Sequence, residues 1–266
     1  MNTHTNKINL NLSDNAEITV NAFIEPIQHT AGNFHEKWDA LANLQAAEPK
    51  SQYSHSDFRE FLPSDAVSVG ECWEIKQTTV KNLLKQLHPN PSLEMRVEMY
   101  GIEEAKGLRA CLRAYNNQLT HIVFRIHAEF ALTDGWFTPS QFAGHLIIDR
   151  TTESIIYFQM GVPEGTLNFD VHWETILEGW DKPRWITDCG YCSKMELWAG
   201  SEDILKGIQY TQAITQEQAE HNLILQFYDS QKINWVSLKE ALELAPKQQK
   251  PVHAISLDGP LTDEAC

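Results

Sequence analysis

One pair of cysteines and one single cysteine are placed in the sequence where thiol chemistry could occur. Cys189 and Cys192 enclose two residues in a C-x-x-C pattern, and Cys266 is the last residue of the sequence. Two thiols this close along the chain can form a disulfide or half of a zinc site. In thioredoxin-like domains the reactive cysteine follows a buried strand and opens a helix, because unpaired amides at the helix start stabilise the thiolate.

The sequence around Cys189 and Cys192 does not have that order. Residues 185–188 before the pair and residues 195–198 after it both have the composition of strands. A helix is expected on neither side, so a structural or incidental pair is favoured. A secondary redox pair and a zinc half-site remain the two alternatives.

The sequence before Cys266 fits the thioredoxin order better. Thr215 with Gln218, and Ser237 with Glu240, have the spacing of capping boxes at two helix starts. Pro246 is expected to end the second helix, after which residues 252–257 predict a strand and residues 258–260 a loop. Spacing alone leaves two interpretations open for Cys266, a redox cysteine or a simple tail residue.

The elements predicted nearer the N-terminus are less regular. Residues 1–60 predict a loosely packed arm with one helix at about 34–47, and residues 71–75 predict a short strand. Apolar residues recur at helical spacing up to His88, and a second helix is expected at about 103–115. Cys111 would lie on the apolar face of that helix as a small core residue.

The strongest strand signal is the alternation of residues 121–132, followed by strands at 142–149 and about 156–162. These predict an antiparallel meander, with Arg125, His127 and Glu129 of the first strand on a wetter face. Metal ions are expected at no site, although His127, Glu129 and His145 are weak candidates for ligands. A solvated or domain-facing sheet surface is the favoured interpretation.

Composition limits the class of partner. Lys and Arg total 21 against 36 Asp and Glu, which gives a formal charge of -15. Nucleic acids and anionic membranes are therefore not expected as partners. No signal peptide or spanning segment is evident, and the five cysteines are too few for a disulfide scaffold. A cytoplasmic protein with reduced thiols is expected.

Several segments resemble the selenoprotein N family. The clearest are Phe124-Arg-Ile-His-Ala-Glu-Phe130 and Trp136-Phe-Thr-Pro-Ser-Gln-Phe-Ala-Gly-His145. Met195-Glu-Leu197, Lys250-Pro-Val-His-Ala-Ile255 and Asp258-Gly-Pro-Leu-Thr-Asp-Glu-Ala-Cys266 follow in the same order. The resemblance extends from about Phe124 to the end, and more weakly from about Trp73.

The resemblance implies a role for Cys266. In the family the matching cysteine is followed by selenocysteine, encoded by UGA, and then by a segment that opens a helix. The chain is therefore expected to be truncated at that codon, and to be inactive as it stands. The fold implied is α+β: an N-terminal arm (1–60), a selenoprotein N-like domain with an antiparallel sheet (61–212) and an incomplete thioredoxin-like domain (213–266).

The function implied is a thiol/selenol-disulfide oxidoreductase with Cys266 as its catalytic cysteine. Its partner would be a thiol or disulfide substrate, expected to be a protein, and no cofactor is implied. The family's animal members have a membrane anchor and a calcium-binding EF-hand, and no stretch of this sequence fits an EF-hand loop. The alternative is a noncatalytic protein-binding or scaffold domain with incidental cysteines.

Overall fold

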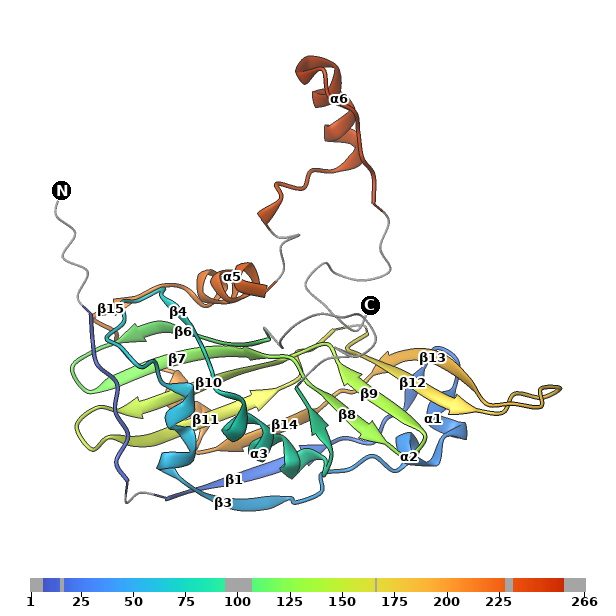
Figure 1. Ribbon diagram of the computed structural model, residues 1–266. Coiled ribbons are helices and arrows are strands. Elements are labelled where there is room, and N and C mark those ends of the chain that lie inside the picture. The colour runs from blue at the N-terminus through green and yellow to red at the C-terminus, as the bar shows by residue number, and fades with distance from the viewer. Residues whose placement is uncertain (1–6, 15–16, 94–106, 166, 228–231, 256–266) are drawn as a thin grey trace.

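The computed structural model describes residues 7–14, 17–93, 107–165, 167–227 and 232–255. Within them, two antiparallel sheets share one apolar core (Figure 1). The nine-stranded sheet has the order β15-β6-β7-β10-β11-β14-β1-β3, with β4 also paired to β6. The six-stranded sheet has the order β2-β13-β12-β9-β8-β5. The α+β class expected from the sequence is confirmed.

The strands of the nine-stranded sheet are β1 (Glu17–Ile24), β3 (Lys50–Ser54), β4 (Cys72–Glu74), β6 (Leu108–Tyr115), β7 (Leu119–Ile126), β10 (Phe142–Asp149), β11 (Ser154–Gly161), β14 (Met195–Ala199) and β15 (Gln212–Ala213). Those of the six-stranded sheet are β2 (His29–Thr30), β5 (Pro91–Ser92), β8 (Glu129–Leu132), β9 (Gly135–Pro139), β12 (Phe169–Thr175) and β13 (Arg184–Tyr191). The helices are α1 (Phe34–Lys37), α2 (Asp39–Ala42), α3 (Gln77–Leu87), α5 (Gln216–Phe227) and α6 (Leu238–Gln248), with two 3-10 turns, η1 (His55–Phe61) and η2 (Glu202–Leu205).

The core lies on the inner face of the nine-stranded sheet. Phe124 of β7 and Phe158 of β11 pack against two phenylalanines of η1, with ring centroids 5.0 Å apart for both Phe61–Phe124 and Phe58–Phe158. Helix α3 adds Val80, Leu83, Leu84 and Leu87, which recur on one helical face and are fully buried. The helix ends before His88, as its sequence predicts.

The single strand predicted at 121–132 is two strands. Strand β7 ends at Ile126 in the nine-stranded sheet, and β8 begins at Glu129 in the other. The chain returns through β9 to β10, which pairs with β7 and then β11. The expected meander is therefore present but is interrupted by a hairpin in the second sheet. The prediction that Arg125, His127 and Glu129 lie on a wetter face is also wrong, because all three side chains are buried.

The helix predicted at 103–115 is wrong where the structure describes it, because residues 108–115 form strand β6. Helical spacing misled because nearly every residue of this strand is buried, so apolar side chains occur on both of its faces. Cys111 is nonetheless fully buried, as expected of a core residue.

The loosely packed arm predicted at 1–60 is wrong for most of its length. Strand β1 lies inside the nine-stranded sheet, between β14 and β3, and Val20 is fully buried. The helix expected at 34–47 is reduced to the short helices α1 and α2. The pairing partner of β1 comes from residues 195–198, so no local pattern reveals it.

The two C-terminal helices begin where their capping residues predict. At α5, the Gln218 amide donates to Thr215 Oγ1 at 3.1 Å, and at α6 the Glu240 amide donates to Ser237 Oγ at 3.2 Å. Pro246 does not end α6 but lies in its last turn, and Gln249 in the left-handed region closes the helix. The strand predicted at 252–257 is wrong where the structure describes it, because residues 251–255 have no regular structure. The remainder of the predicted strand, 256–257, lies outside the described residues.

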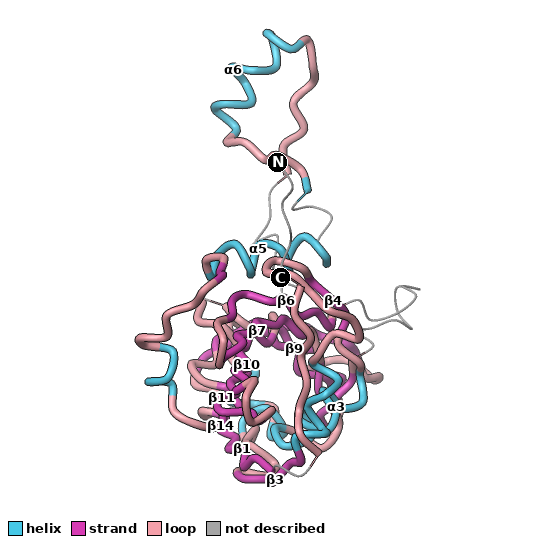
Figure 2. The backbone as a smooth tube through the Cα atoms, turned by 90° about the vertical axis from the view of Figure 1, so that its left-hand side faces the viewer, coloured by secondary structure: helices cyan, strands magenta, loops and turns pink. Residues whose placement is uncertain are grey.

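Helix α5 lies over one end of the nine-stranded sheet, beside β6, whereas α6 stands away from both sheets (Figures 1 and 2). Helix α5 buries Ala219 and Leu223, and α6 buries no residue. Among the described residues, no helix combines the length and apolar character that crossing a membrane requires.

Candidate functional site

Polar side chains with chemical potential gather on the outer face of β6, β7 and β10. Strand alternation places Phe124 on the inner face and its neighbours Val123 and Arg125 on the outer face. The register aligns Cys111 with Val123, and Val123 with His145 of β10. We call this surface the outer polar face. Helix α5 packs over its β6 and β7 part, where Ala219 and Leu223 lie against Cys111 and Val123.

Two cysteines on this face lie directly opposite each other. Cys72 of β4 is the register partner of Cys111 of β6. The Leu112 amide donates to the Glu71 carbonyl at 3.1 Å, and the Ile75 amide to the Leu108 carbonyl at 3.0 Å. Hydrogen-bonded pairs alternate along an antiparallel ladder, so Cys72 and Cys111 form a non-hydrogen-bonded pair, the kind with the closer side chains.

The two thiols differ in environment. Cys72 is partly exposed, whereas Cys111 is fully buried in a small cluster with Val123, Ala219 and Leu223. The Cys111 thiol, by hydrogen bonding to the Cys72 sulfur, holds the pKa of Cys72 below its ordinary value. The same hydrogen bond, together with burial, raises the pKa of Cys111. Of the two thiols, Cys72 is therefore the one that ionises more readily.

A second polar group of the face is a pair of histidines, His121, which is buried, and His145, which is partly exposed. His121 Nε2 lies 2.9 Å from His145 Nδ1, and His121 Nδ1 lies 3.0 Å from both the Tyr210 hydroxyl and Arg113 Nη1. Burial, followed by the positive Arg113, lowers the pKa of His145 to about 4. Burial likewise lowers the pKa of His121, with His145 and Arg113 adding to the effect. Both rings are neutral at physiological pH.

The weak metal candidates are not brought together. His145 bonds to His121, whereas His127 lies beyond the end of β7, with its ring 4.4 Å from that of Phe227. Burial and then the charge of Arg125 lower the pKa of His127 to about 3. Among the described residues, no group of three or more His, Cys, Asp or Glu side chains is placed to hold a metal ion.

Cys189 and Cys192 lie at the end of β13 in the other sheet, and neither is in a disulfide. The Cys192 thiol is buried against the Lys194 carbonyl oxygen at 3.4 Å, and burial raises its pKa to about 11. Asn168 holds the Cys192 backbone through two hydrogen bonds, each 2.8 Å long. As expected, strands lie on both sides of the motif rather than a helix.

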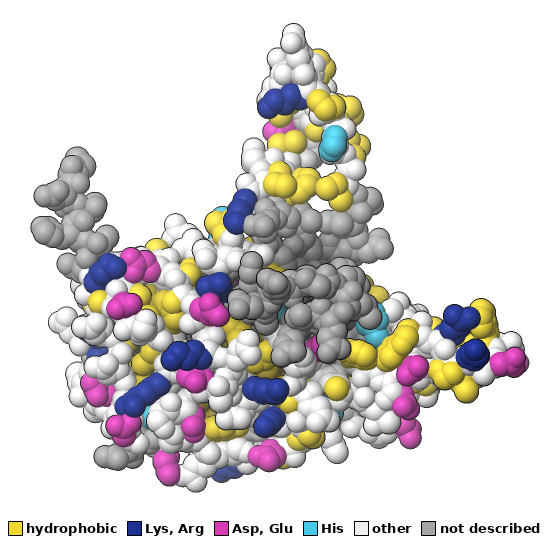
Figure 3. Space-filling view, in the orientation of Figure 1, with side chains coloured by type: hydrophobic (Ala, Val, Ile, Leu, Met, Phe, Trp, Pro, Cys, Tyr) yellow, Lys and Arg dark blue, Asp and Glu magenta, His cyan; other side chains and the backbone are white. Residues whose placement is uncertain are grey.

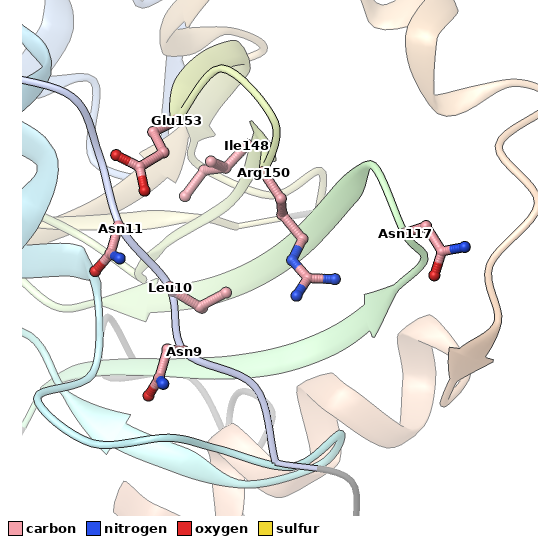
Figure 4. A pocket seen from close by; sticks show the side chains of 7 residues that line it. All are labelled: Asn9, Leu10, Asn11, Asn117, Ile148, Arg150 and Glu153. Carbon is pink, nitrogen blue, oxygen red and sulfur yellow. The ribbon is translucent and has the colours of Figure 1, made fainter.

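Cys266 lies outside the described residues, so the structure gives no geometry for it. A cavity of about 170 Å³ occurs elsewhere, beside β10, and is lined by Asn9, Leu10, Asn11, Asn117, Ile148, Arg150 and Glu153 (Figure 4). The positively charged side chain that lines it, Arg150, already has a partner, because Arg150 Nη1 donates to the Asn116 carbonyl at 2.8 Å. The lining contains no thiol or imidazole, so this cavity offers less chemistry than the outer polar face.

Three curated proteins are similar to this chain. It is 28% identical over 286 residues to selenoprotein N of Mus musculus, covering 85% of this chain and 50% of that protein. It is 29% identical over 272 residues to selenoprotein N of Danio rerio, covering 81% of this chain and 47% of that protein. Selenoprotein N of Homo sapiens is 27% identical over 286 residues, covering 85% of this chain and 47% of that protein. The chain is therefore similar to selenoprotein N over most of its own length.

The selenoprotein N-like chain spans about half the length of the curated relatives it matches. No protein-family model and no solved structure matches it. The segments that carry the resemblance, 124–130 and 136–145, each contain a crossing from one sheet to the other. They contribute Arg125 and His145 to the outer polar face, and His127 lies just beyond the end of β7.

The pairing of Cys72 with Cys111 was not predicted from the sequence. Each cysteine lies in a short segment, and their proximity depends on the register between β4 and β6. The available signal was Leu108 to Leu112, in which Leu108, Ala110 and Leu112 alternate with Arg109 and Cys111 as in a strand.

Proposed function

We propose that this chain belongs to a thiol/selenol-disulfide oxidoreductase of the selenoprotein N type, in which Cys266 is one member of the redox pair. The observation that supports the proposal is the similarity of 85% of the chain to proteins named selenoprotein N. The second member would be the selenocysteine that follows the matching cysteine in the family. No step of this chemistry requires a cofactor.

The reaction would exchange one disulfide for another. The selenolate attacks a substrate disulfide, forms a mixed selenenylsulfide and releases one substrate thiolate. The Cys266 thiolate then attacks the selenium atom and releases the second substrate thiol. The substrate has gained two electrons, and the enzyme holds a Cys266–selenocysteine bond that a thiol reductant reopens.

Selenium is suited to the attacking role because a selenol ionises below the ordinary thiol pKa of about 8.5. Cys266 would resolve the mixed intermediate. The capped helices α5 and α6 precede it in the chain, and residues 251–255 between α6 and Cys266 form no strand. The 266-residue chain without selenium is then expected to reduce disulfides very slowly.

The decisive experiment compares this chain with one extended by selenocysteine and the downstream helix. Reduction of a protein disulfide is expected only in the extended protein, and Cys266→Ser in it should slow turnover while leaving the selenol open to alkylation. Equal activity of both chains would place the active site elsewhere.

A noncatalytic protein-binding domain is the second candidate, and one observation favours it. The end of the β12–β13 hairpin projects from the body and carries exposed apolar side chains, with Ile176 61%, Trp180 51% and Trp185 49% exposed (Figure 3). Exposed aromatic clusters are typical of protein-binding surfaces. If the extended protein does not reduce disulfides, while Trp180→Ala with Trp185→Ala abolishes binding of a copurifying protein, this candidate is favoured.

A further inference from the structure

The backbone brings Cys72 and Cys111 close enough for a disulfide. In non-hydrogen-bonded pairs of antiparallel strands the Cα atoms are about 4.5 Å apart. Disulfides span Cα separations of about 4.4–6.8 Å, so the two thiols can be joined without moving either strand far. Cys72 and Cys111 are reduced in this structure, and both side chains turn toward α5.

The two thiols also differ in their access to solvent. Cys72 is reachable from solvent and lies near the guanidinium of Arg109, which favours its thiolate. Cys111 is fully buried, with Ala219 and Leu223 of α5 over it. A disulfide in solution can therefore react with Cys72 first, and the buried Cys111 can react only with the Cys72 sulfur.

We propose that Cys72 and Cys111 form a second redox centre, distinct from Cys266, that exchanges with small disulfides of the glutathione disulfide class. Cys72 is the attacking thiol and Cys111 the resolving thiol. This centre requires neither selenium nor the proposed function of Cys266.

The exchange balances in two steps. The Cys72 thiolate attacks one sulfur of glutathione disulfide, which forms a Cys72–glutathione bond and releases one glutathione thiolate. The Cys111 thiol loses its proton and attacks the Cys72 sulfur, releasing the second glutathione. The protein loses two electrons and gains the Cys72–Cys111 disulfide, while glutathione disulfide is reduced to two thiols. Excess glutathione reverses both steps.

Oxidation of the pair would change the contacts that helix α5 makes with it. The Asn222 amide donates to the Gly70 carbonyl at 3.1 Å, just before β4, and Asn222 also hydrogen-bonds to the Cys111 thiol. Forming the disulfide removes the thiol that Asn222 contacts. The α5 side of the site therefore repacks when the pair is oxidised.

Peptide mapping of the purified chain tests the proposal. After incubation with glutathione disulfide, acid quenching and trypsin digestion without reductant, a disulfide-linked pair of peptides, residues 60–76 and 110–113, should be found by mass spectrometry. Dithiothreitol should abolish it. If Cys72 and Cys111 stay reduced in excess glutathione disulfide, or Cys72 is linked to another cysteine, the proposal is overturned.

Variants assign the roles. Cys111→Ser should lose the link and accumulate the Cys72–glutathione adduct, whereas Cys72→Ser should lose the link and leave Cys111 unmodified. Glutathione on Cys111 in Cys72→Ser, with circular dichroism unchanged, would refute the assigned order. If Cys72→Ser fails to fold, the order of alkylation in the unsubstituted chain decides, since Cys72 must react before Cys111.

Two further variants serve as controls. Cys189→Ser and Cys266→Ser should each form the linked peptides to the same extent as the unsubstituted chain. A link that disappears in Cys266→Ser would show that Cys72 is oxidised through Cys266 and overturn the independent centre. Failure of the Cys266 proposal alone would leave the link intact, so the two proposals fail separately.

Discussion

The two faces of the nine-stranded sheet use the same strands for different purposes. On the inner face, Phe124 and Phe158 stack against the aromatic rings of η1. On the outer face of β6, β7 and β10 lie a thiol, imidazoles and guanidinium groups, and α5 packs over the thiol. One face contributes chiefly to folding, and the other holds reactive groups in a fixed arrangement.

The difference shows that burial stabilises an aromatic side chain but disfavours the charged form of a histidine. For an aromatic ring, removal from water contributes to the free energy of folding. For His121 and His145, it favours the neutral form at a cost that grows in acid. A sheet with both faces covered can therefore separate stability from chemistry by the simple alternation of its side chains.

Removing an inner-face ring should have the largest effect. Phe158 is fully buried against Phe58, Phe61 and Phe124. Phe158→Ala should lower the free energy of unfolding by about 3–5 kcal/mol, measured in urea. The control Phe23→Ala, at a side chain 42% exposed on β1, should change it by no more than about 1 kcal/mol. Equal losses would contradict the division between core and surface.

Opening the cover of the outer face should have a smaller effect on stability but a specific effect on reactivity. Leu223 is buried beside Cys111. Leu223→Ala should cost about 2–3 kcal/mol and make Cys111 react faster with iodoacetamide in the folded protein. Gln226→Ala, at an exposed position of α5, should do neither. Unchanged alkylation of Cys111 in a folded Leu223→Ala protein would show that α5 does not shield it.

The outer face should also make the protein sensitive to acid. His121, His127 and His145 have pKa values lowered by burial, so in the unfolded chain they bind protons that the folded protein does not. Their contribution is fully present above the unfolded pKa of about 6.5 and is lost as pH falls toward the folded pKa values. Each histidine should therefore cost about 2 kcal/mol between pH 7 and pH 5.

A single variant isolates that contribution. His121→Gln should reduce the loss of unfolding free energy between pH 7 and pH 5 by about 2 kcal/mol, whatever its stability at pH 7. His29→Gln, at an exposed position of β2, is the matched control. The same pH dependence in both variants would show that burial does not lower the pKa of His121 in the folded protein.

Local signals in the sequence predicted the parts of this fold that local physics decides. The capping residues Thr215 and Ser237 began their helices as expected, and strand β10 has the predicted bounds. Strand β6 was mistaken for a helix because α5 buries its second face, a contact that no pattern within 108–115 announces. The Cys72–Cys111 pair was missed for the same reason, since it is created by pairing between distant segments.

The smallest effect is expected at the C-x-x-C motif of the other sheet. Burial raises the pKa of Cys192 to about 11, so its thiolate fraction at pH 7 is only about one in ten thousand. In Cys189→Ser with Cys192→Ser, the Asn168 bonds to the backbone of residue 192 are retained, and a hydroxyl can still donate to the Lys194 carbonyl. The free energy of unfolding should change by no more than about 1 kcal/mol.

In the same double variant, formation of the Cys72–Cys111 disulfide in glutathione disulfide should be unchanged, as should disulfide reduction by the selenocysteine-containing protein. The comparison between the two cysteine pairs is informative because neither is in a disulfide, yet the pKa of the partly exposed Cys72 is lowered, whereas burial raises the pKa of Cys192. Loss of most exchange in a double variant that still folds would reverse this assignment and make Cys189 and Cys192 the reactive pair.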